Sequence, residues 1–253
     1  MLTFYCLLLG KCYEKVSEYI VFWLCKQSVF SIIVHCQTMQ KKSDWLVPVG
    51  LMVLCLVPII AGSVRIGQLS TTSNITPENA RFFTAPGMVI VHIVCSCVFC
   101  FVGALQFSRG FRRKFHQWHR KAGTVLMLFG FLAALTGLWI TQSFPHLPSD
   151  GPTLYWVRLI VGVAMTFCLI FAVQAIRRKS FKEHGNWMTR SYALGLGAGT
   201  QVFTHLPWMI ALGTAPTGLE RDTAMAAGWL INACVAEWII WRKHPARRLA
   251  VGV

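Results

Sequence analysis

Long apolar stretches separated by short polar segments make up most of the chain from residue 45 onward. Six of them contain the roughly 20 mostly apolar residues that a helix needs to cross a hydrocarbon layer about 30 Å thick. They cover residues 45–65, 86–107, 122–141, 153–176, 187–212 and 223–241. They lack the period-two alternation of barrel strands, and only helices or closed barrels satisfy their backbone groups in lipid. The pattern predicts an all-α polytopic membrane protein, a bundle of six transmembrane helices.

The amino-acid composition is also typical of a protein that lies in a lipid bilayer. The 253 residues are 55% apolar and 13% charged, which is unusual for a soluble globular domain. Lys and Arg number 24 against 9 Asp and Glu, an excess that could suggest nucleic-acid binding. The cations form short clusters next to the predicted spans instead of one continuous face. This arrangement favours anionic lipid headgroups and argues against a nucleic-acid partner.

The cationic clusters lie on alternate predicted loops. One side of the bundle carries only Arg65, Arg81 and Arg221. The other side carries Lys41, Lys42, Arg109, Arg112, Arg113, Lys114, Arg120, Lys121, Arg177, Arg178, Lys179, Lys182, Arg190, Arg242, Lys243, Arg247 and Arg248. The positive-inside rule therefore predicts that both chain ends are cytoplasmic.

Residues 1–38 do not continue this pattern. A polar break at residues 26–28 interrupts an aromatic-rich run, and the segment lacks the basic start and cleavage site of a signal peptide. Residues 39–44, Met-Gln-Lys-Lys-Ser-Asp, are typical of the start of a bacterial inner-membrane protein. We therefore expect an N-terminal extension over residues 1–38, disordered, surface-lying or untranslated. A six-helix domain over residues 39–253 in the bacterial inner membrane would follow it.

Four histidines fall at two matched depths. His92 lies about 9 Å inside the second span, counted from Pro86 at about 1.5 Å per residue, and His205 lies at a similar depth near the outer end of the fifth. At the cytoplasmic end, His119 opens the third span and His184 precedes the fifth. On one continuous helix, His184 and His205 would be about 31 Å apart along the axis and within about 60° around it. One helix face would then carry a histidine at each membrane surface.

Two such pairs suit a membrane protein with two haem groups. Ionisable residues inside a membrane are costly and usually face the bundle interior, and bundles build cofactor sites from facing helices. Imidazole binds iron readily. The leading hypothesis is a b-type haem protein that moves electrons across the membrane through two bis-histidine sites, His92 with His205 and His119 with His184. Quinone or a periplasmic metal is the candidate redox partner.

Two arginines lie near the same levels. Arg158 falls near the outer end of the fourth span, and Arg190 lies at the level of Glu237 near the inner face. An arginine fork binds both oxygens of a carboxylate, so each could hold a haem propionate. Snorkelling of Arg158 and an ion pair between Arg190 and Glu237 explain them equally well.

Small residues line one stripe of the third span. Gly123, Gly130 and Gly137 are spaced by seven, and His119 shares the stripe. Small residues allow a neighbouring helix, or a flat macrocycle, to approach closely.

The same histidines allow two other kinds of function. In one, the protein is a cofactor-free assembly factor or small-solute permease, and the histidines only join helices by hydrogen bonds. In the other, His116, His119 and His184 hold zinc or copper at the cytoplasmic face, because the first two are three residues apart and can share a helix face. Hydrolase and phosphate-loop motifs are missing from the sequence, and its acidic residues are too sparse for paired-carboxylate chemistry.

Three segments resemble a known family. They are Gly-Ala-Leu-Gln-Phe at 103–107, Trp-His-Arg-Lys-Ala-Gly at 118–123, and His-Gly-Asn-Trp-Met-Thr-Arg-Ser-Tyr at 184–192. Over roughly residues 45–240 the chain resembles bacterial predicted membrane proteins catalogued as domain of unknown function 2306. That resemblance implies fold and topology but no activity, and it adds Gln106 to the candidate cofactor-binding residues. Its motif residues here are Gln106, Phe107, His119, Arg120, Gly123, His184, Trp187, Met188, Arg190, Ser191 and Tyr192.

The layout is also similar to two-haem transmembrane b-type cytochromes. It departs from them because the predicted fifth helix carries two histidines and the fourth carries none.

Overall fold

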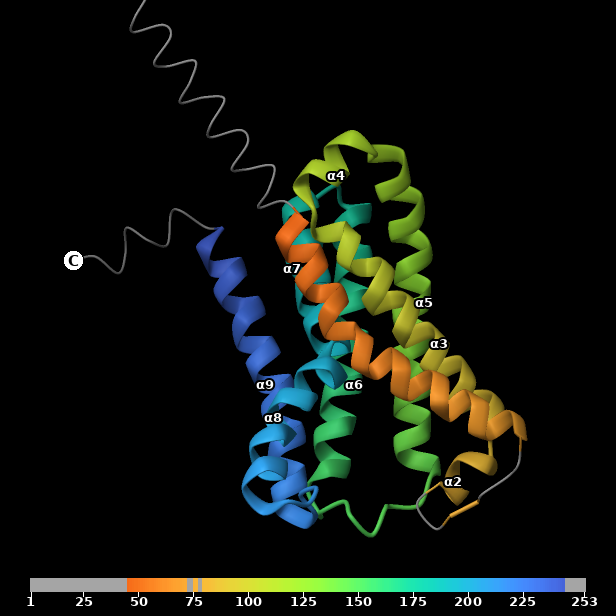
Figure 1. The fold of residues 1–253 in the computed structure, drawn as a ribbon. Coiled ribbons are helices and arrows are strands. Elements are labelled where there is room, and N and C mark those ends of the chain that lie inside the picture. Colours follow the sequence, from red (N-terminus) through yellow and green to blue (C-terminus); the bar gives the residue numbers. More distant parts are fainter. Residues whose placement is uncertain (1–44, 72–74, 77–78, 244–253) are drawn as a thin grey trace, which may run out of the picture. The chain divides into compact units, whose positions relative to one another are not determined.

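The described part of the computed structural model, residues 45–71, 75–76 and 79–243, folds into helices. The predictions for residues 1–38 lie outside these ranges. A first helix, Trp45–Thr71, precedes the labelled elements of Figure 1. They are α2 (Ala80–Phe83), α3 (Pro86–Gly103), η1 (Ala104–Phe107), α4 (Arg109–Lys114), α5 (His116–Ser143), α6 (Leu154–Arg177), α7 (Phe181–Gly195), α8 (Gly197–Leu212) and α9 (Gly218–Arg242). The all-α class is confirmed for the described residues.

Five helices of the described part are long and apolar enough to cross a membrane: Trp45–Thr71, Pro86–Phe107, His116–Ser143, Leu154–Arg177 and Gly218–Arg242. They correspond to five of the six predicted spans. The chain is therefore a membrane protein with multiple apolar helices.

The predicted continuous span 187–212 is divided in the structure. The helix is interrupted at Leu196, between α7 and α8. Glycines on both sides weaken the helix, and the two that follow the break allow close packing. A Cβ on Gly197 would collide with the indole of Trp229, and one on Gly199 would collide with the backbone of Leu54. The expectation that His184 and His205 share one face of a continuous helix is therefore wrong.

The centre of the bundle is packed by side chains from the first helix, α3, η1, α5, α6 and α7. The buried members are Cys55, Phe99, Cys100, Ala104, Ala134, Met165, Leu169, Tyr192 and Leu196. Within this core the Tyr192 hydroxyl donates a 2.6 Å hydrogen bond to the Cys100 carbonyl. Because the tyrosine has a backbone partner, its polar atom can be buried at little cost.

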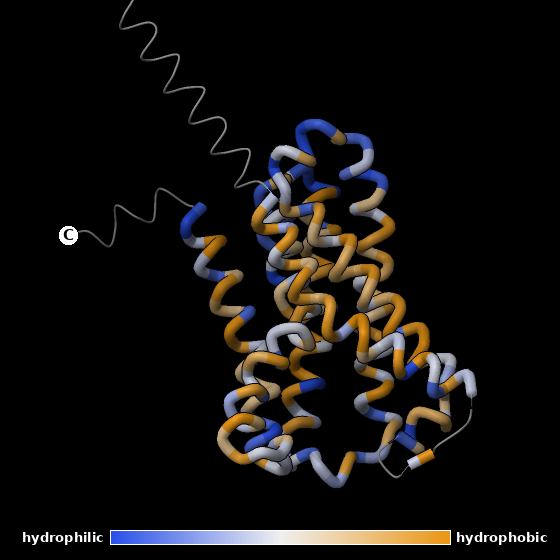
Figure 2. The backbone as a smooth tube through the Cα atoms, viewed as in Figure 1, coloured by the Kyte–Doolittle hydropathy of each residue, from blue (hydrophilic) through white to orange (hydrophobic). Residues whose placement is uncertain are grey.

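The outer surfaces of the helices are apolar. Figure 2 shows hydrophobic residues along the middle of the bundle and hydrophilic ones concentrated near its ends. Large apolar side chains such as Ile160, Ile210 and Leu230 are exposed by 65%, 75% and 65%. An apolar exposed belt of this extent is unfavourable in water and suits a lipid environment.

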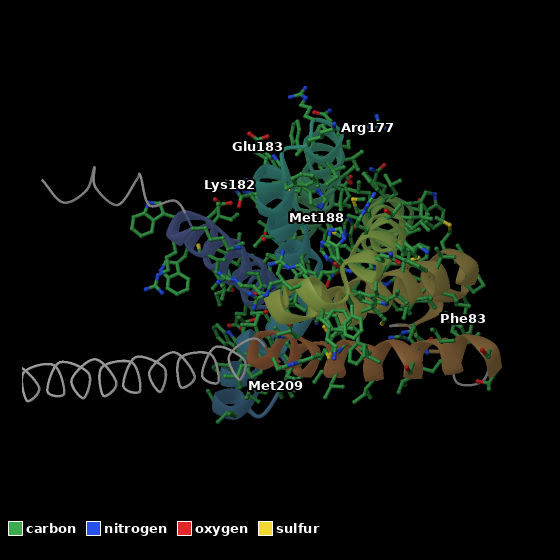
Figure 3. All side chains as sticks on the ribbon, turned by 90° about the horizontal axis from the view of Figure 1, so that it is seen from above. Phe83, Arg177, Lys182, Glu183, Met188 and Met209 are labelled. Carbon is green, nitrogen blue, oxygen red and sulfur yellow. The ribbon has the colours of Figure 1, made fainter. Side chains whose placement is uncertain are left out.

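Basic side chains gather at one end of the bundle, called here the basic end. It contains α4, the start of α5 and the turn between α6 and α7 (Figure 1). Figure 3 looks along the bundle and labels Arg177, Lys182 and Glu183 around that turn. Burial and the charges of Arg109 and Arg112 lower the pKa of Lys243, the residue that follows α9.

The opposite end, called here the α2 end, is held by two buried aspartates. Asp222 of α9 accepts hydrogen bonds from the backbone N–H groups of Gly151, Thr153 and Leu154 at 2.8, 2.9 and 3.0 Å, and from the Thr153 hydroxyl at 2.7 Å. It thereby satisfies donors at the start of α6. Asp150 receives hydrogen bonds from Arg158 at 2.8 Å and Arg221 at 2.9 Å. These bonds connect α6 and α9 to the loop between α5 and α6.

Candidate functional site

Two polar side chains at the basic end have buried atoms without partners. Gln106 lies in η1, and neither its amide nitrogen nor its amide oxygen has a hydrogen-bond partner within the described residues. His119 lies in the first turn of α5, and its Nδ1 is unpartnered in the same sense. A Cβ on Gly123 would lie 3.9 Å from the Gln106 oxygen, so the glycine places bare backbone beside the amide. Buried polar atoms are nearly always satisfied in proteins, so this group needs an explanation.

His184 joins this group from α7. Its Nδ1 lies 2.9 Å from the carbonyl oxygen of Ala172 in α6. A carbonyl can only accept, so in the neutral ring the proton sits on Nδ1 and the lone pair on Nε2. His119 lies within electrostatic range of His184, His116 and Arg112. The structure thus places both predicted inner histidines in one region.

The turn before α5 positions His119. Ser108 caps α4, accepting a hydrogen bond from the backbone N–H of Phe111 at 3.1 Å. The ring of Phe111 then packs against Phe115 and Trp118, each at a centroid distance of 4.9 Å. The short helix α4 and this aromatic cluster fix where α5 begins, and so fix the depth of His119.

His92 is held between α3 and α5 at the deeper level. Its Nδ1 lies 3.0 Å from the Ala133 carbonyl oxygen and 3.1 Å from the Thr136 hydroxyl oxygen. The ring packs against Gly137, where a Cβ would lie 3.0 Å from Cε1. Here the small-residue stripe serves close packing of two helices.

His205 is bonded within its own helix. Its Nδ1 lies 2.7 Å from the carbonyl oxygen of Gln201, one turn earlier in α8. That helix is fastened to α9 by hydrogen bonds from Gln201 to Met225 and from Thr204 to Ala224. The bonds made by His92 and His205 therefore do not link α3 to α8.

A comparison with known families adds a finding to this geometry. A family described as "Predicted membrane protein (DUF2306)" matches residues 89–240, more than half of the chain. The chain belongs to this family. Searches of the curated proteins and of the solved structures found no match. The resemblance inferred from the three motif segments is confirmed over residues 89–240.

The motif segments of this DUF2306 chain meet at and below the basic end. The ring of Tyr192 packs against Phe107 at 4.7 Å and Phe99 at 5.8 Å between centroids. A Cβ on Gly103 would lie 3.0 Å from the Tyr192 ring. Segments about 80 residues apart in the sequence thus contact one another beside the unpartnered Gln106.

Both arginines considered as propionate partners are paired with protein carboxylates. Arg190 donates to both oxygens of Glu237, the second bond measuring 2.9 Å, and its guanidinium lies 4.6 Å from the Trp187 ring centroid. Arg158 is bound to Asp150.

The described residues contain no group of three or more His, Cys, Asp or Glu side chains that could hold a metal ion. His116, His119 and His184, considered above as a zinc or copper site, do not form such a group in this part of the chain. His116 itself is exposed at the first position of α5.

Sequence reasoning missed the polar network of the α2 end. The sequence pattern assigned no role to Asp150 or Asp222 and counted Arg81 only among the loop cations. The sequence offered one clue to this network, the scarcity of acidic residues. Only nine occur in the chain, and two of them are buried here.

Proposed function

We propose that this DUF2306 protein is a b-type haem protein of the bacterial inner membrane that transfers electrons, with its principal site at the basic end. His119 and His184 would hold the haem iron, with Gln106 beside them. Bound haem b would supply reversible one-electron transfer at its iron. Quinone dissolved in the bilayer is the candidate partner.

The observation that supports this proposal most directly is the hydrogen bonding of three of the four histidines; Nδ1 of His119 has no such partner among the described residues. Nδ1 of His92, His184 and His205 each lies within 3.0 Å of a backbone carbonyl oxygen. Each bond favours the neutral tautomer with its lone pair on Nε2, and it orients the ring. Histidines that bind metals through one ring nitrogen almost always donate from the other in this way.

A second observation, the unpartnered polar atoms near His119 and His184, also supports a bound haem at the inner site. The unpartnered atoms of Gln106 and His119 leave a polar surface that no described residue satisfies. Gly123 keeps that surface free of a side chain. A bound group with polar atoms at its edge could form hydrogen bonds with these unpartnered atoms and so remove the free-energy cost of burying them.

The outer pair has weaker support. The carbonyl partners of His92 and His205 favour the same tautomer, but these bonds hold His92 of α3 against α5 and His205 against its own helix, α8. A second haem between them stays a prediction. We further propose that α7 and α8 together form a sixth crossing, with both chain ends in the cytoplasm. The cations gathered at the basic end support this orientation, and the fluorescence of a C-terminal green fluorescent protein fusion would test it.

The test is an absorption spectrum of the full chain, purified in detergent from cells supplied with haem precursor. We expect a Soret band and sharp α and β bands after dithionite reduction. His119→Ala and His184→Ala should each abolish the inner haem and lower the haem-to-protein ratio by one. The matched control is His116→Ala, which removes an exposed histidine one turn earlier and should leave the spectrum unchanged.

A featureless spectrum from wild-type protein with native helical circular dichroism would overturn the proposal. An unchanged spectrum in both inner variants would place the haem elsewhere and refute the assignment of ligands.

A cofactor-free membrane protein is the second candidate, favoured by one observation. The side chains of His92 and His184 bond carbonyls of neighbouring helices, as structural residues that join helices would. In that case His92→Ala should lower stability by about 1 kcal/mol, the typical net value of such bonds, in a protein that never shows a Soret band.

A further inference from the structure

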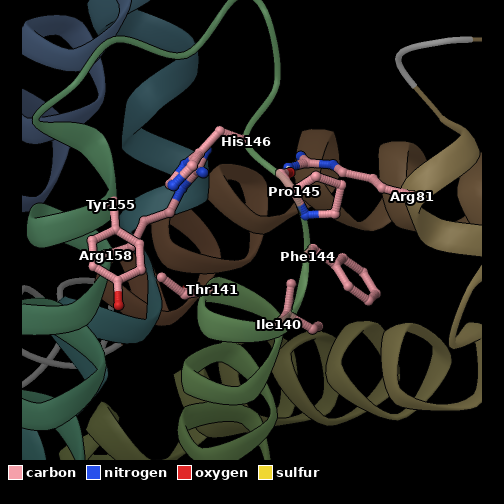
Figure 4. Close-up of a pocket in the computed structure, with 8 residues that line it drawn as sticks. All are labelled: Arg81, Ile140, Thr141, Phe144, Pro145, His146, Tyr155 and Arg158. Atoms are coloured by element: carbon pink, nitrogen blue, oxygen red, sulfur yellow. The ribbon is translucent and has the colours of Figure 1, made fainter.

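A cavity of about 80 Å³ lies at the α2 end, outside the histidine sites. It is formed by α2, the end of α5, the loop after it and the start of α6, as Figure 4 shows. Its lining residues are Arg81, Ile140, Thr141, Phe144, Pro145, His146, Tyr155 and Arg158. Since one water occupies about 30 Å³ of liquid, the cavity has room for one small polar group.

Arg81 reaches this cavity with part of its guanidinium unsatisfied. One terminal nitrogen donates to the Pro145 carbonyl at 3.2 Å. The Nε is buried and has no partner among the described residues. The guanidinium lies 4.7 Å from the Phe82 ring centroid, which fixes its plane. A buried N–H of a charged group without an acceptor is unfavourable.

The surroundings carry more positive than negative charge. Arg158 lines the cavity from the other side and shares the carboxylate of Asp150 with Arg221. One carboxylate between two guanidinium groups leaves a net positive charge, and Arg81 adds another. The nearby carboxylate of Asp222 is occupied by donors at the start of α6. Burial and the charge of Arg158 lower the pKa of Arg81, so an anion in the cavity would relieve an existing penalty.

We propose that this cavity binds an oxyanion, a carboxylate or phosphate group, which accepts a hydrogen bond from Arg81 Nε and is attracted by the charge of Arg158. Arginine is suited to such groups because its planar fork matches their oxygens. The small volume restricts the bound part to the anionic group itself. That group belongs either to a free small anion or to a lipid headgroup. The proposal does not depend on haem.

The experiment measures thermal unfolding of the delipidated full chain in an uncharged detergent. Sodium phosphate and sodium acetate are titrated at constant ionic strength, with chloride as the balancing anion. A short-chain phosphatidylglycerol is titrated in parallel, with the matching diacylglycerol as its phosphate-free control. We expect a saturable rise in the unfolding temperature with at least one oxyanion. Saturation by phosphate or acetate identifies a free anion, and saturation by the phospholipid alone identifies a headgroup.

Substitutions separate a built site from general charge attraction. Arg81→Gln and Arg81→Lys should each weaken the apparent affinity roughly tenfold or more, since both remove the Nε donor and the second retains the charge. The matched control is Arg65→Gln. Arg65 also stacks on the Phe82 ring, at 4.4 Å, but it does not line the cavity.

An equal loss of affinity in Arg65→Gln and Arg81→Gln would refute the proposal. So would wild-type affinity in Arg81→Lys, or the lack of a saturable rise with every oxyanion.

Discussion

Removal of the Asp222 carboxylate should cost more stability than its position near the start of α9 suggests. The side chain is 1% exposed and accepts four hydrogen bonds, three of them from backbone N–H groups. A buried donor left without an acceptor costs about 1–3 kcal/mol, so three would cost about 3–9 kcal/mol. Two effects reduce this free-energy cost. Thr153 is exposed and Gly151 half-buried, so water can reach them, and the variant no longer buries a charge. We therefore expect Asp222→Ala to lower the free energy of unfolding by about 2–4 kcal/mol.

The assay is reversible unfolding in mixed micelles, followed by far-ultraviolet circular dichroism as the fraction of dodecyl sulfate is raised. Asp222→Asn keeps one acceptor oxygen but turns an NH₂ group toward backbone donors, so its loss should be smaller, about 1–2 kcal/mol. The control is Glu220→Ala, which removes an exposed carboxylate in the same turn and should stay within about 0.5 kcal/mol of wild type. An Asp222→Ala protein as stable as the control would show that the four bonds do not stabilise the α2 end.

Three further predictions concern pH, packing and a surface ion pair. Burial raises the pKa of Asp150, but the hydrogen bonds and charges of Arg158 and Arg221 outweigh it and lower the pKa overall. The contribution of Asp150 to stability should therefore be complete above its unfolded-state pKa and be lost as the pH falls through the folded-state value, a dependence that Asp150→Asn should remove in acid unfolding curves. Gly130→Ala should cost about 1–3 kcal/mol in the micelle assay, because its Cβ would lie 2.8 Å from the Phe99 ring. Gly67→Ala, with nothing within 4 Å, should be neutral or stabilising by up to about 1 kcal/mol, and equal effects at both glycines would contradict the argument. In a double-mutant cycle, Arg190→Ala and Glu237→Ala should show a coupling below about 1 kcal/mol, because the Glu237 side chain is 56% exposed and water screens the pair; a coupling above 2 kcal/mol would mean that the pair is shielded from water.

The spanning helices could be predicted because length and apolarity are local properties. Five predicted spans have counterparts in the structure, with ends shifted by several residues. The division at Leu196 could not be predicted in the same way. It reflects close approaches of Trp229 to Gly197 and of Leu54 to Gly199, and these depend on which helices become neighbours.

Equal predicted depth in the membrane indicated spatial neighbours for the inner pair, His119 and His184, but not for the outer pair, His92 and His205. His119 and His184 lie in first turns at the same end of the bundle, so depth alone brings them near one another. The surroundings of His92 and His205 depend on lateral packing, which depth does not determine. Asp222 was missed for a related reason, since the helix start that it caps lies 68 residues away in the sequence.

A comparison of the buried polar groups at the two ends of the bundle supports a functional reason for the buried atoms that have no hydrogen-bond partner. At the α2 end, Asp222 satisfies three backbone donors and Asp150 serves two arginines, so this chain can satisfy buried polar groups where stability requires it. In the described residues, the buried side-chain atoms left without partners belong to Arg81, Gln106 and His119. Arg81 lines a cavity and lies among other arginines, while His119 lies near a second histidine beside a bare glycine. Poor packing would scatter such atoms across the bundle. Their concentration at two places that each offer chemistry for a ligand favours binding at both.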